Sequence, residues 1–276
     1  MKKGSFSTVL LIIVLVAGLS LMLYPSFSNY WNDLHQTKAI ANYTEAVAKL
    51  DDKDYSHVWE AAIAYNESLL LRDHGYKLTE EQKISYEHQF NIAGNGIIGY
   101  IDIPGIDIFL PIYHGTSEGV LQVAIGHIEW SSLPTGGENT HCVVSGHRGL
   151  PSAKLFSDLD KLKVGDRFIF NILDQSLTYE VDQINIVEPY ELNDLRILEG
   201  QDLCTLVTCT PYGVNSHRLL VRGHRVENEM EEEVIRISND AIQIEPLLVA
   251  PVVAAPILLS LLILLFTTGK KQKNKS

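Results

Sequence analysis

The chain has 276 residues, a formal net charge of −12 and three cysteines. A strongly acidic balance argues against nucleic acid as a partner, because a phosphate backbone attracts basic surfaces. An odd and low cysteine count argues against a framework of disulfides and indicates a free reactive thiol.

Two uncharged apolar runs lie near the ends of the chain. The first covers residues 6–24 and follows Lys2 and Lys3, and the second covers residues 247–266 and precedes four lysines. A membrane-spanning helix needs roughly 20 apolar residues, and basic flanks indicate cytoplasmic ends. We therefore expect a cell-membrane protein with two spans, whose middle part, residues 28–243, is extracellular.

Each apolar run has an alternative interpretation. The first could be a cleaved signal peptide, although the run continues beyond its small residues at 17–20 without a clear cleavage site. The second could be a buried core helix, but its length and the lysines after it favour a span. Its two prolines are compatible with a spanning helix.

All 34 acidic residues lie between the two apolar runs, whereas six of the 22 basic residues lie outside them. The middle of the chain therefore carries a net charge of −18. Such a charge is typical of a soluble domain, and it is also compatible with ligands that carry lysine side chains. Charge alone does not decide between these two.

The first part of this middle region has helical periodicity. Apolar residues recur at three- to four-residue steps through residues 28–72, which predicts two helices, with the acidic residues at 51–54 between them as a cap for the second. Residues 73–95 contain turn signals and a short polar helix that begins near Thr79. This segment is either a plain connection or a mobile cover.

From Ile97 to Val226 the pattern changes to short apolar, β-branched runs separated by turn signals such as Pro104-Gly105. Seven or eight strands with few helices predict a mostly β fold closed into a barrel. The short helix candidates are residues 152–162 and 191–198. The strands we expect are residues 97–103, 106–110, 142–145, 167–172, 177–187, 204–208 and 219–226.

Three side chains suggest acyl-transfer chemistry. Cys209 ends an apolar strand-like run, Arg218 begins the next one, and His147 lies at a glycine-flanked junction between a strand and a loop. A thiol at the end of a strand can meet a substrate, and a nearby cation favours its thiolate. A nucleophile, a proton carrier and a cationic oxyanion partner together suffice for acyl transfer through a thioester.

Other interpretations of these residues fit less well. Cys204 and Cys209 lie five apart on one strand and would point to opposite faces, and no finger-like ligand spacing is present, so we expect no metal site. Cys142 and Cys204 lie in apolar runs and are expected to be buried. Papain-type proteases place the cysteine before the histidine, and the caspase signature is missing.

The chain resembles the sortase family, and in particular its class C, the pilus-assembly sortases. The second apolar run also fits this class, since housekeeping sortases usually have only the amino-terminal span. The resemblance covers roughly residue 28 to the C-terminus. It rests on TLVTC at 205–209, YHGTS at 113–117, GH at 126–127, SLP at 132–134, GHRGLP at 146–151 and NSHR at 215–218.

The resemblance implies a mostly β fold: an eight-stranded sortase barrel with an N-terminal helical hairpin, flanked by two transmembrane helices. The expected parts are an anchor (1–27), the hairpin with a lid-like segment (28–95), the catalytic barrel (96–226), an acidic stalk (227–245), a second span (246–268) and a basic cytoplasmic tail (269–276). The barrel would lie on the outer face of a Gram-positive cell.

The resemblance also implies the reaction and the partners. A sortase cleaves an LPxTG-like signal between Thr and Gly, so Cys209 would form a thioacyl enzyme, His147 would exchange protons with the amines and Arg218 would stabilise the substrate or the oxyanion. In class C the acceptor is a lysine amine of another pilin subunit. No cofactor is implied, and calcium dependence stays open.

Two functional alternatives remain. A sortase that anchors surface proteins to a cell-wall precursor would use the same three residues with another acceptor. A non-enzymatic membrane-bound domain would bind sorting signals without turnover. One feature departs from class C: the Asp-Pro-aromatic lid triplet is absent, and Asp73 and Tyr76 are the lid candidates in the corresponding region.

Overall fold

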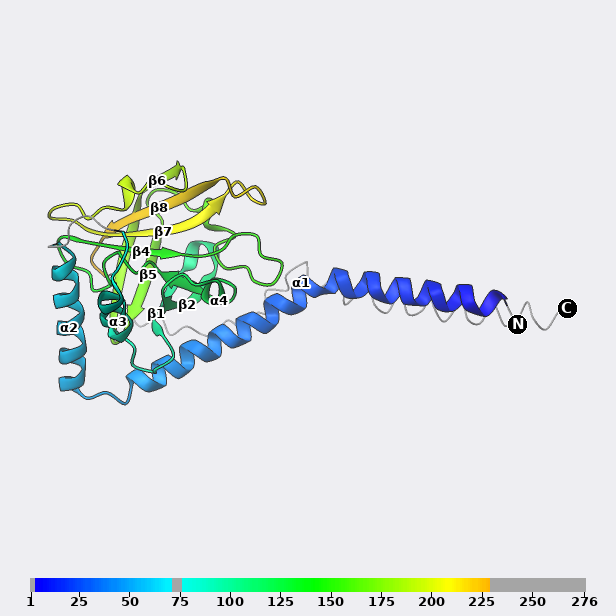
Figure 1. The fold of residues 1–276 in the computed structure, drawn as a ribbon, viewed down its shortest axis with the longest axis horizontal. Helices are drawn as coiled ribbons and strands as arrows, with labels where there is room; N and C mark the ends of the chain where they lie inside the picture. Colours follow the sequence, from blue (N-terminus) through cyan, green and yellow to red (C-terminus); the bar gives the residue numbers. More distant parts are fainter. Residues whose placement is uncertain (1–2, 71–75, 229–276) are drawn as a thin grey trace. The chain divides into compact units, whose positions relative to one another are not determined.

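The computed structural model describes residues 3–70 and 76–228. Eight strands form most of the domain, and three of the four described helices precede them (Figure 1). The helices are α1 (Lys3–Val47), α2 (Asp52–Leu70), α3 (Glu80–His88) and α4 (Glu118–Leu121), with 3₁₀ turns at Pro104–Ile106, Leu159–Lys161 and Asn193–Leu195. The strands are β1 (Ile97–Ile103), β2 (Ile108–His114), β3 (Ile125–His127), β4 (Thr140–Ser145), β5 (Arg167–Ile172), β6 (Gln175–Val187), β7 (Asp202–Thr210) and β8 (His217–Arg225).

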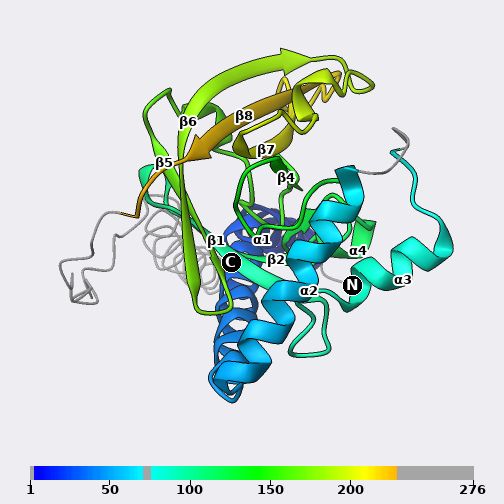
Figure 2. The ribbon, with the colours of Figure 1, turned by 90° about the vertical axis from the view of Figure 1, so that its left-hand side faces the viewer.

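The strands close into a barrel in the order β1-β2-β3-β4-β7-β8-β6-β5 (Figure 2). Two pairings are parallel, β2 with β3 and β4 with β7, and the others are antiparallel. The parallel pairing of β4 and β7 matters most for the site. Both strands run in one direction, so their carboxyl ends meet at the same edge of the barrel.

The predicted mostly β fold with a closed barrel is confirmed, and two of its strands, 97–103 and 167–172, match the prediction residue for residue. The short strand β3 and the one-turn helix α4 were not predicted from the sequence. The predicted helices at 152–162 and 191–198 are wrong, since these segments contain only single 3₁₀ turns. Both segments gain their order from packing: Phe156, Leu159 and Leu195 are buried.

The barrel has an apolar interior and a second apolar cluster on its outer surface. Successive side chains of a strand point to opposite faces, and β7 follows this rule. Cys204 and Leu206 belong to the interior core, whereas Val207 belongs to the outer cluster, which also contains Val143, Leu195 and Leu220. Trp130 packs against this outer cluster.

Buried polar side chains fasten the helices to the barrel. Tyr43 of α1 donates a hydrogen bond to Ile98 O at 3.1 Å and accepts one from Leu173 N at 2.8 Å. Asn66 of α2 bonds the backbone of Leu133 through both ends of its amide, at 3.0 and 2.8 Å. These contacts fix the helical pair against the strands.

The predicted helix starts are confirmed. Asp51 Oδ1 accepts the backbone N–H of Lys53 at 3.0 Å and of Asp54 at 2.9 Å at the start of α2. Thr79 and Gln82 form a capping box at the start of α3. Tyr86 of α3 then bonds the buried His127, with 2.9 Å between the hydroxyl and Nδ1, so α3 is tied to β3.

Within the described residues, one helix is long and apolar enough to cross a membrane. It covers Leu10–Val47, and its most apolar window has a mean hydropathy of 2.3. A signal sequence near the N-terminus would satisfy the same criterion. The predicted second span at 246–268 and the tail after it lie outside the described residues, as does most of the predicted stalk.

Candidate active site

Cys209 lies one residue before the end of β7, where the strand enters the loop to β8. Its thiol is partly exposed, whereas Cys142 and Cys204 are buried. Because side chains alternate along the strand, Cys209 shares the outer face of the barrel with Val207, two residues earlier. The thiol is therefore at the mouth of the outer apolar cluster and accessible to a substrate.

Arg218 lies directly opposite Cys209 in the antiparallel pairing of β7 with β8. Opposed residues of such a pair project from the same face with their Cβ atoms about 5 Å apart. The guanidinium is held by two backbone carbonyl groups, with Nη1 donating to Asn215 O at 3.2 Å and to His217 O at 3.1 Å. The cation is thus fixed next to the thiol.

His147 is brought to the same edge by the parallel pairing of β4 and β7, in which Ser145 is opposite Val207. Two hydrogen bonds continue this pairing beyond the end of β4. Gly146 N donates to Val207 O at 3.1 Å, and Thr208 Oγ1 donates to Gly146 O at 2.8 Å. The residue after Gly146 therefore lies level with the end of β7, where the thiol is.

A carboxylate also faces the imidazole of His147. This contact was not predicted from the sequence. Glu118 Oε2, on α4, is 3.9 Å from His147 Nε2. The glutamate side chain is 75% exposed, so solvent screens this interaction. The strand-like pattern around His114 gave no sign of the single turn of helix that presents Glu118.

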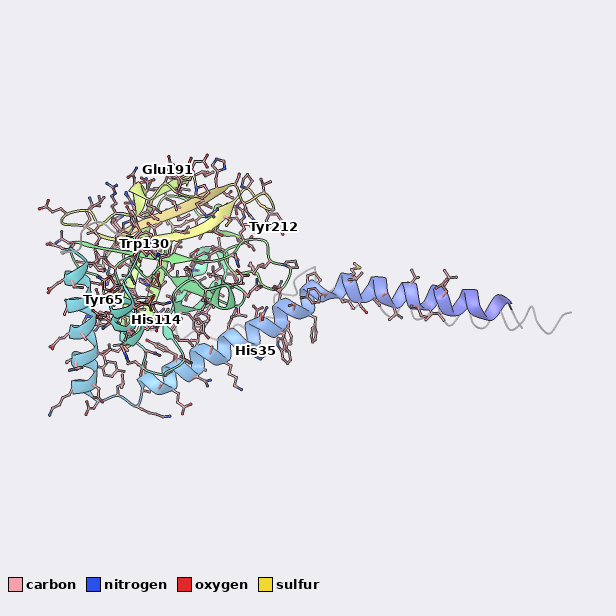
Figure 3. All side chains as sticks on the ribbon, in the orientation of Figure 1. His35, Tyr65, His114, Trp130, Glu191 and Tyr212 are labelled. Atoms are coloured by element: carbon pink, nitrogen blue, oxygen red, sulfur yellow. The ribbon has the colours of Figure 1, made fainter. Side chains whose placement is uncertain are left out.

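A cavity of about 720 Å³ adjoins the amino ends of β4 and β7. Trp130 from the β3–β4 connection, Leu195 from the β6–β7 connection and His141 of β4 contribute to its walls. Figure 3 labels Trp130, and it also labels Tyr212 in the loop beyond the thiol. The outer apolar cluster connects this cavity to the barrel edge that carries Cys209. Leu195 belongs to both the cluster and the cavity wall, and Trp130 lines the cavity and packs against the cluster.

His141 organises the wall of this cavity, a role that the sequence did not reveal. Its Nδ1 donates to Arg196 O at 2.7 Å, which leaves Nε2 to accept from the hydroxyl of Thr205 at 2.7 Å. Burial lowers the pKa of His141 from 6.5 to about 4, so the ring is neutral. A neutral imidazole thereby links the β6–β7 connection to β4 and β7.

Of the two lid candidates, the structure describes Tyr76 but not Asp73. Tyr76 packs edge-on against Trp130, with 4.9 Å between ring centroids, and it is 39% exposed at the cavity wall. Asp73 lies outside the described residues. The role of Asp73 as a lid residue therefore stays a prediction.

The other two cysteines have structural surroundings. They lie opposite each other on β4 and β7 inside the barrel, and burial raises the pKa of the Cys204 thiol well above its usual value. Among the residues described here, no group of three or more His, Cys, Asp or Glu side chains could hold a metal ion. Cys209 is thus the accessible thiol, and it lies beside Arg218 and level with His147.

The closed barrel carries these three groups at neighbouring strand ends, and sortases, which are cysteine transpeptidases, share this fold. The Sortase domain family model matches residues 101–226 of the chain. The crystal structure of sortase C1 from Streptococcus agalactiae is 54% identical, covers 70% of this chain and all of its own, and has a TM-score of 0.68. The chain belongs to the sortase family and has strong structural matches among class C sortases.

Two further relatives place this similarity in context. Sortase C1 of GBS Pilus Island 1 is 42% identical over 71% of this chain and 94% of its own, with a TM-score of 0.65. Sortase D of Bacillus subtilis (strain 168) is 30% identical over 131 residues, which is 46% of this chain. The matched part spans 63% of the length of that relative.

Proposed function

We propose that this protein is a pilus-type sortase that joins pilin subunits through lysine isopeptide bonds. Sortases are cysteine transpeptidases, and they act on LPxTG-type sorting signals. The observation that carries the proposal is the register around β7, in which Arg218 is opposite Cys209 on one side and the strand leading to His147 is paired on the other.

In the proposed reaction, the sulfur of Cys209 attacks the carbonyl carbon between Thr and Gly of the sorting signal. The new C–S bond forms as the C–N bond to glycine breaks, and His147 gives its proton to the departing amine. Arg218 stabilises the negative charge that develops on the carbonyl oxygen. The product is a thioacyl enzyme whose acyl group ends in threonine.

A lysine amine of a second pilin subunit then attacks the thioester. His147 takes the proton of the amine, the C–S bond breaks, and the Cys209 thiolate is regenerated. Two observations support this acceptor. The part of the chain between its apolar runs has a net charge of −18 and would attract a protonated lysine. One relative of high structural similarity is named for a pilus island.

The experiment is mass spectrometry of the full-length protein in detergent with an LPxTG peptide and a lysine-bearing pilin fragment. An adduct on Cys209 that resolves into a Thr–Lys isopeptide is the expected result. A thioester that resolves only with an amine of a cell-wall precursor would instead establish the anchoring alternative.

The control is the Cys209→Ala variant. The removal of a partly exposed thiol leaves no large cavity, so we expect a free energy of unfolding within about 0.5 kcal/mol of the wild type. Turnover should be abolished. Binding of the peptide by the wild type with no adduct under any condition would favour the non-enzymatic alternative.

A further inference from the structure

The residues that follow His147 and Cys209 contact each other. Arg148 comes directly after the imidazole and Thr210 directly after the thiol, and Arg148 Nη1 donates a long hydrogen bond of 3.4 Å to Thr210 Oγ1. The loop after β4 and the end of β7 are thus joined one residue beyond each reactive group.

The Arg148 guanidinium is built into the protein. Its side chain is 10% exposed, and Nη2 is 2.5 Å from Asp160 Oδ2, in the 3₁₀ turn Leu159–Lys161. A buried cation needs a counter-charge, and removal of one partner from such a pair leaves an uncompensated charge. Asp160 therefore determines where the guanidinium lies.

Both ends of the link between Arg148 and Thr210 are held by hydrogen bonds to neighbouring residues. On one side, Phe156 N donates to His147 O at 3.1 Å, and Gly149 N donates to Ser157 Oγ at 3.0 Å. On the other side, Thr210 is 7% exposed and pairs with His217 of β8. Movement of the guanidinium would therefore shift the His147 loop relative to β7.

We propose that Arg148 is a positioning residue that sets the distance between His147 and Cys209 by bridging Asp160 and Thr210. This inference rests on the proposed function, which gives the imidazole and the thiol their roles. Arg148 acts through its neighbours and not on the substrate. Proton transfer demands close alignment, and a misplacement of about 1 Å costs roughly 100-fold in rate.

The test compares two neighbouring carboxylates in the full-length protein in detergent. Asp160→Asn removes the partner of Arg148. Asp158→Asn is the matched control, because Asp158 pairs with Lys154 at 3.4 Å and Lys161 at 2.9 Å. The measurements are kcat and KM for an LPxTG peptide, the rate of Cys209 alkylation and the temperature of unfolding.

We expect Asp160→Asn to lower kcat roughly tenfold or more, with KM within about twofold of the wild type. Asp158→Asn should leave kcat and KM unchanged. Arg148→Ala should lower kcat at least as far as Asp160→Asn, and Arg148→Lys, which keeps the charge beside Asp160, should recover part of the loss. Thr210→Val removes the other end of the link and should also lower kcat.

A purely structural role predicts a different result. Asp160→Asn and Thr210→Val would then lower the unfolding temperature while kcat per folded molecule stayed at the wild-type value, and the proposal would be wrong. If Arg148→Ala does not fold, these two variants decide the outcome. The proposed function fails separately, through wild-type protein without turnover or Cys209→Ala with full turnover.

Discussion

Thr208 on β7 donates a 2.8 Å hydrogen bond from Oγ1 to the carbonyl oxygen of Gly146, immediately before His147. Its side chain points into the barrel, while the neighbouring Cys209 points outward. One residue of β7 therefore fixes the strand end that carries the imidazole, and the next presents the thiol.

The Thr208→Val variant tests this relationship. Valine keeps the shape but leaves the buried carbonyl of Gly146 without this donor, which costs about 1–3 kcal/mol. We expect the free energy of unfolding in urea to fall by that amount and kcat to fall more than KM changes. Thr208→Ser keeps the hydroxyl and is the control; equal losses in both variants would contradict the role of the hydrogen bond.

Gly149 is expected to tolerate no side chain while Tyr212 is present. Its φ is 76°, and a Cβ placed there would lie 2.7 Å from the ring of Tyr212 in the β7–β8 loop. Gly149→Ala should push this loop away from the His147 loop and lower kcat. The double variant Gly149→Ala/Tyr212→Ala removes the clash, so it should recover activity while the backbone strain of about 1 kcal/mol persists. An active single variant would contradict the contact.

Arg218 is expected to need its planar guanidinium as well as its charge. Nη1 is held by two carbonyl oxygens, and lysine cannot reproduce this arrangement. Arg218→Lys should lower kcat for an LPxTG peptide roughly 100- to 1,000-fold, as expected when one oxyanion donor is lost. Arg218 is only partly buried, so the Arg218→Ala and Arg218→Lys variants should unfold near the wild-type temperature. Equal activity of Arg218→Lys and wild type would contradict the proposed role.

The free energy of unfolding is expected to decrease as the pH falls below about 6.5. Burial lowers the pKa of both His114 and His141 from 6.5 to about 4, so the unfolded chain binds more protons between these values. The free energy of unfolding should be unaffected by these groups above pH 6.5 and decrease as the pH falls from about 6.5 to 4. The slope is about 1.4 kcal/mol per pH unit for each histidine.

Urea unfolding across that range measures this slope. The His141→Gln variant keeps a donor for Arg196 O and an acceptor for Thr205, and it should show about half of the acid destabilisation attributed to the pair. An unchanged slope in this variant would show that His141 does not contribute.

The lid prediction concerns Asp73 and Tyr76. Tyr76 packs on Trp130, which lies against the outer apolar cluster that ends at the thiol. If this segment covers the site, Asp73→Ala combined with Tyr76→Ala should speed the alkylation of Cys209 and the cleavage of a sorting peptide. An unchanged rate would rule out a covering role, and Tyr190→Ala, an exposed tyrosine elsewhere on the domain, is the control.

The regular strands were predictable because their signal is local. The apolar run at residues 97–103, the alternation at residues 167–172 and the turn residues between runs are present in short windows of sequence. The 3₁₀ turns near Leu159 and Leu195 were mistaken for helices, because burial against the barrel, and not local propensity, orders them. The three-residue strand β3 is too short to show a period.

The sequence by itself determined the chemistry: one cysteine at a strand end, a histidine at a glycine-flanked junction and an arginine at the next strand start. Their proximity was decided only by the tertiary structure. The parallel pairing of β4 with β7 joins Ser145 to Val207, 62 residues later, and no local pattern encodes such a register. The contacts of Arg148 with Asp160 and Thr210 were equally invisible, because they form only when folding brings these side chains together.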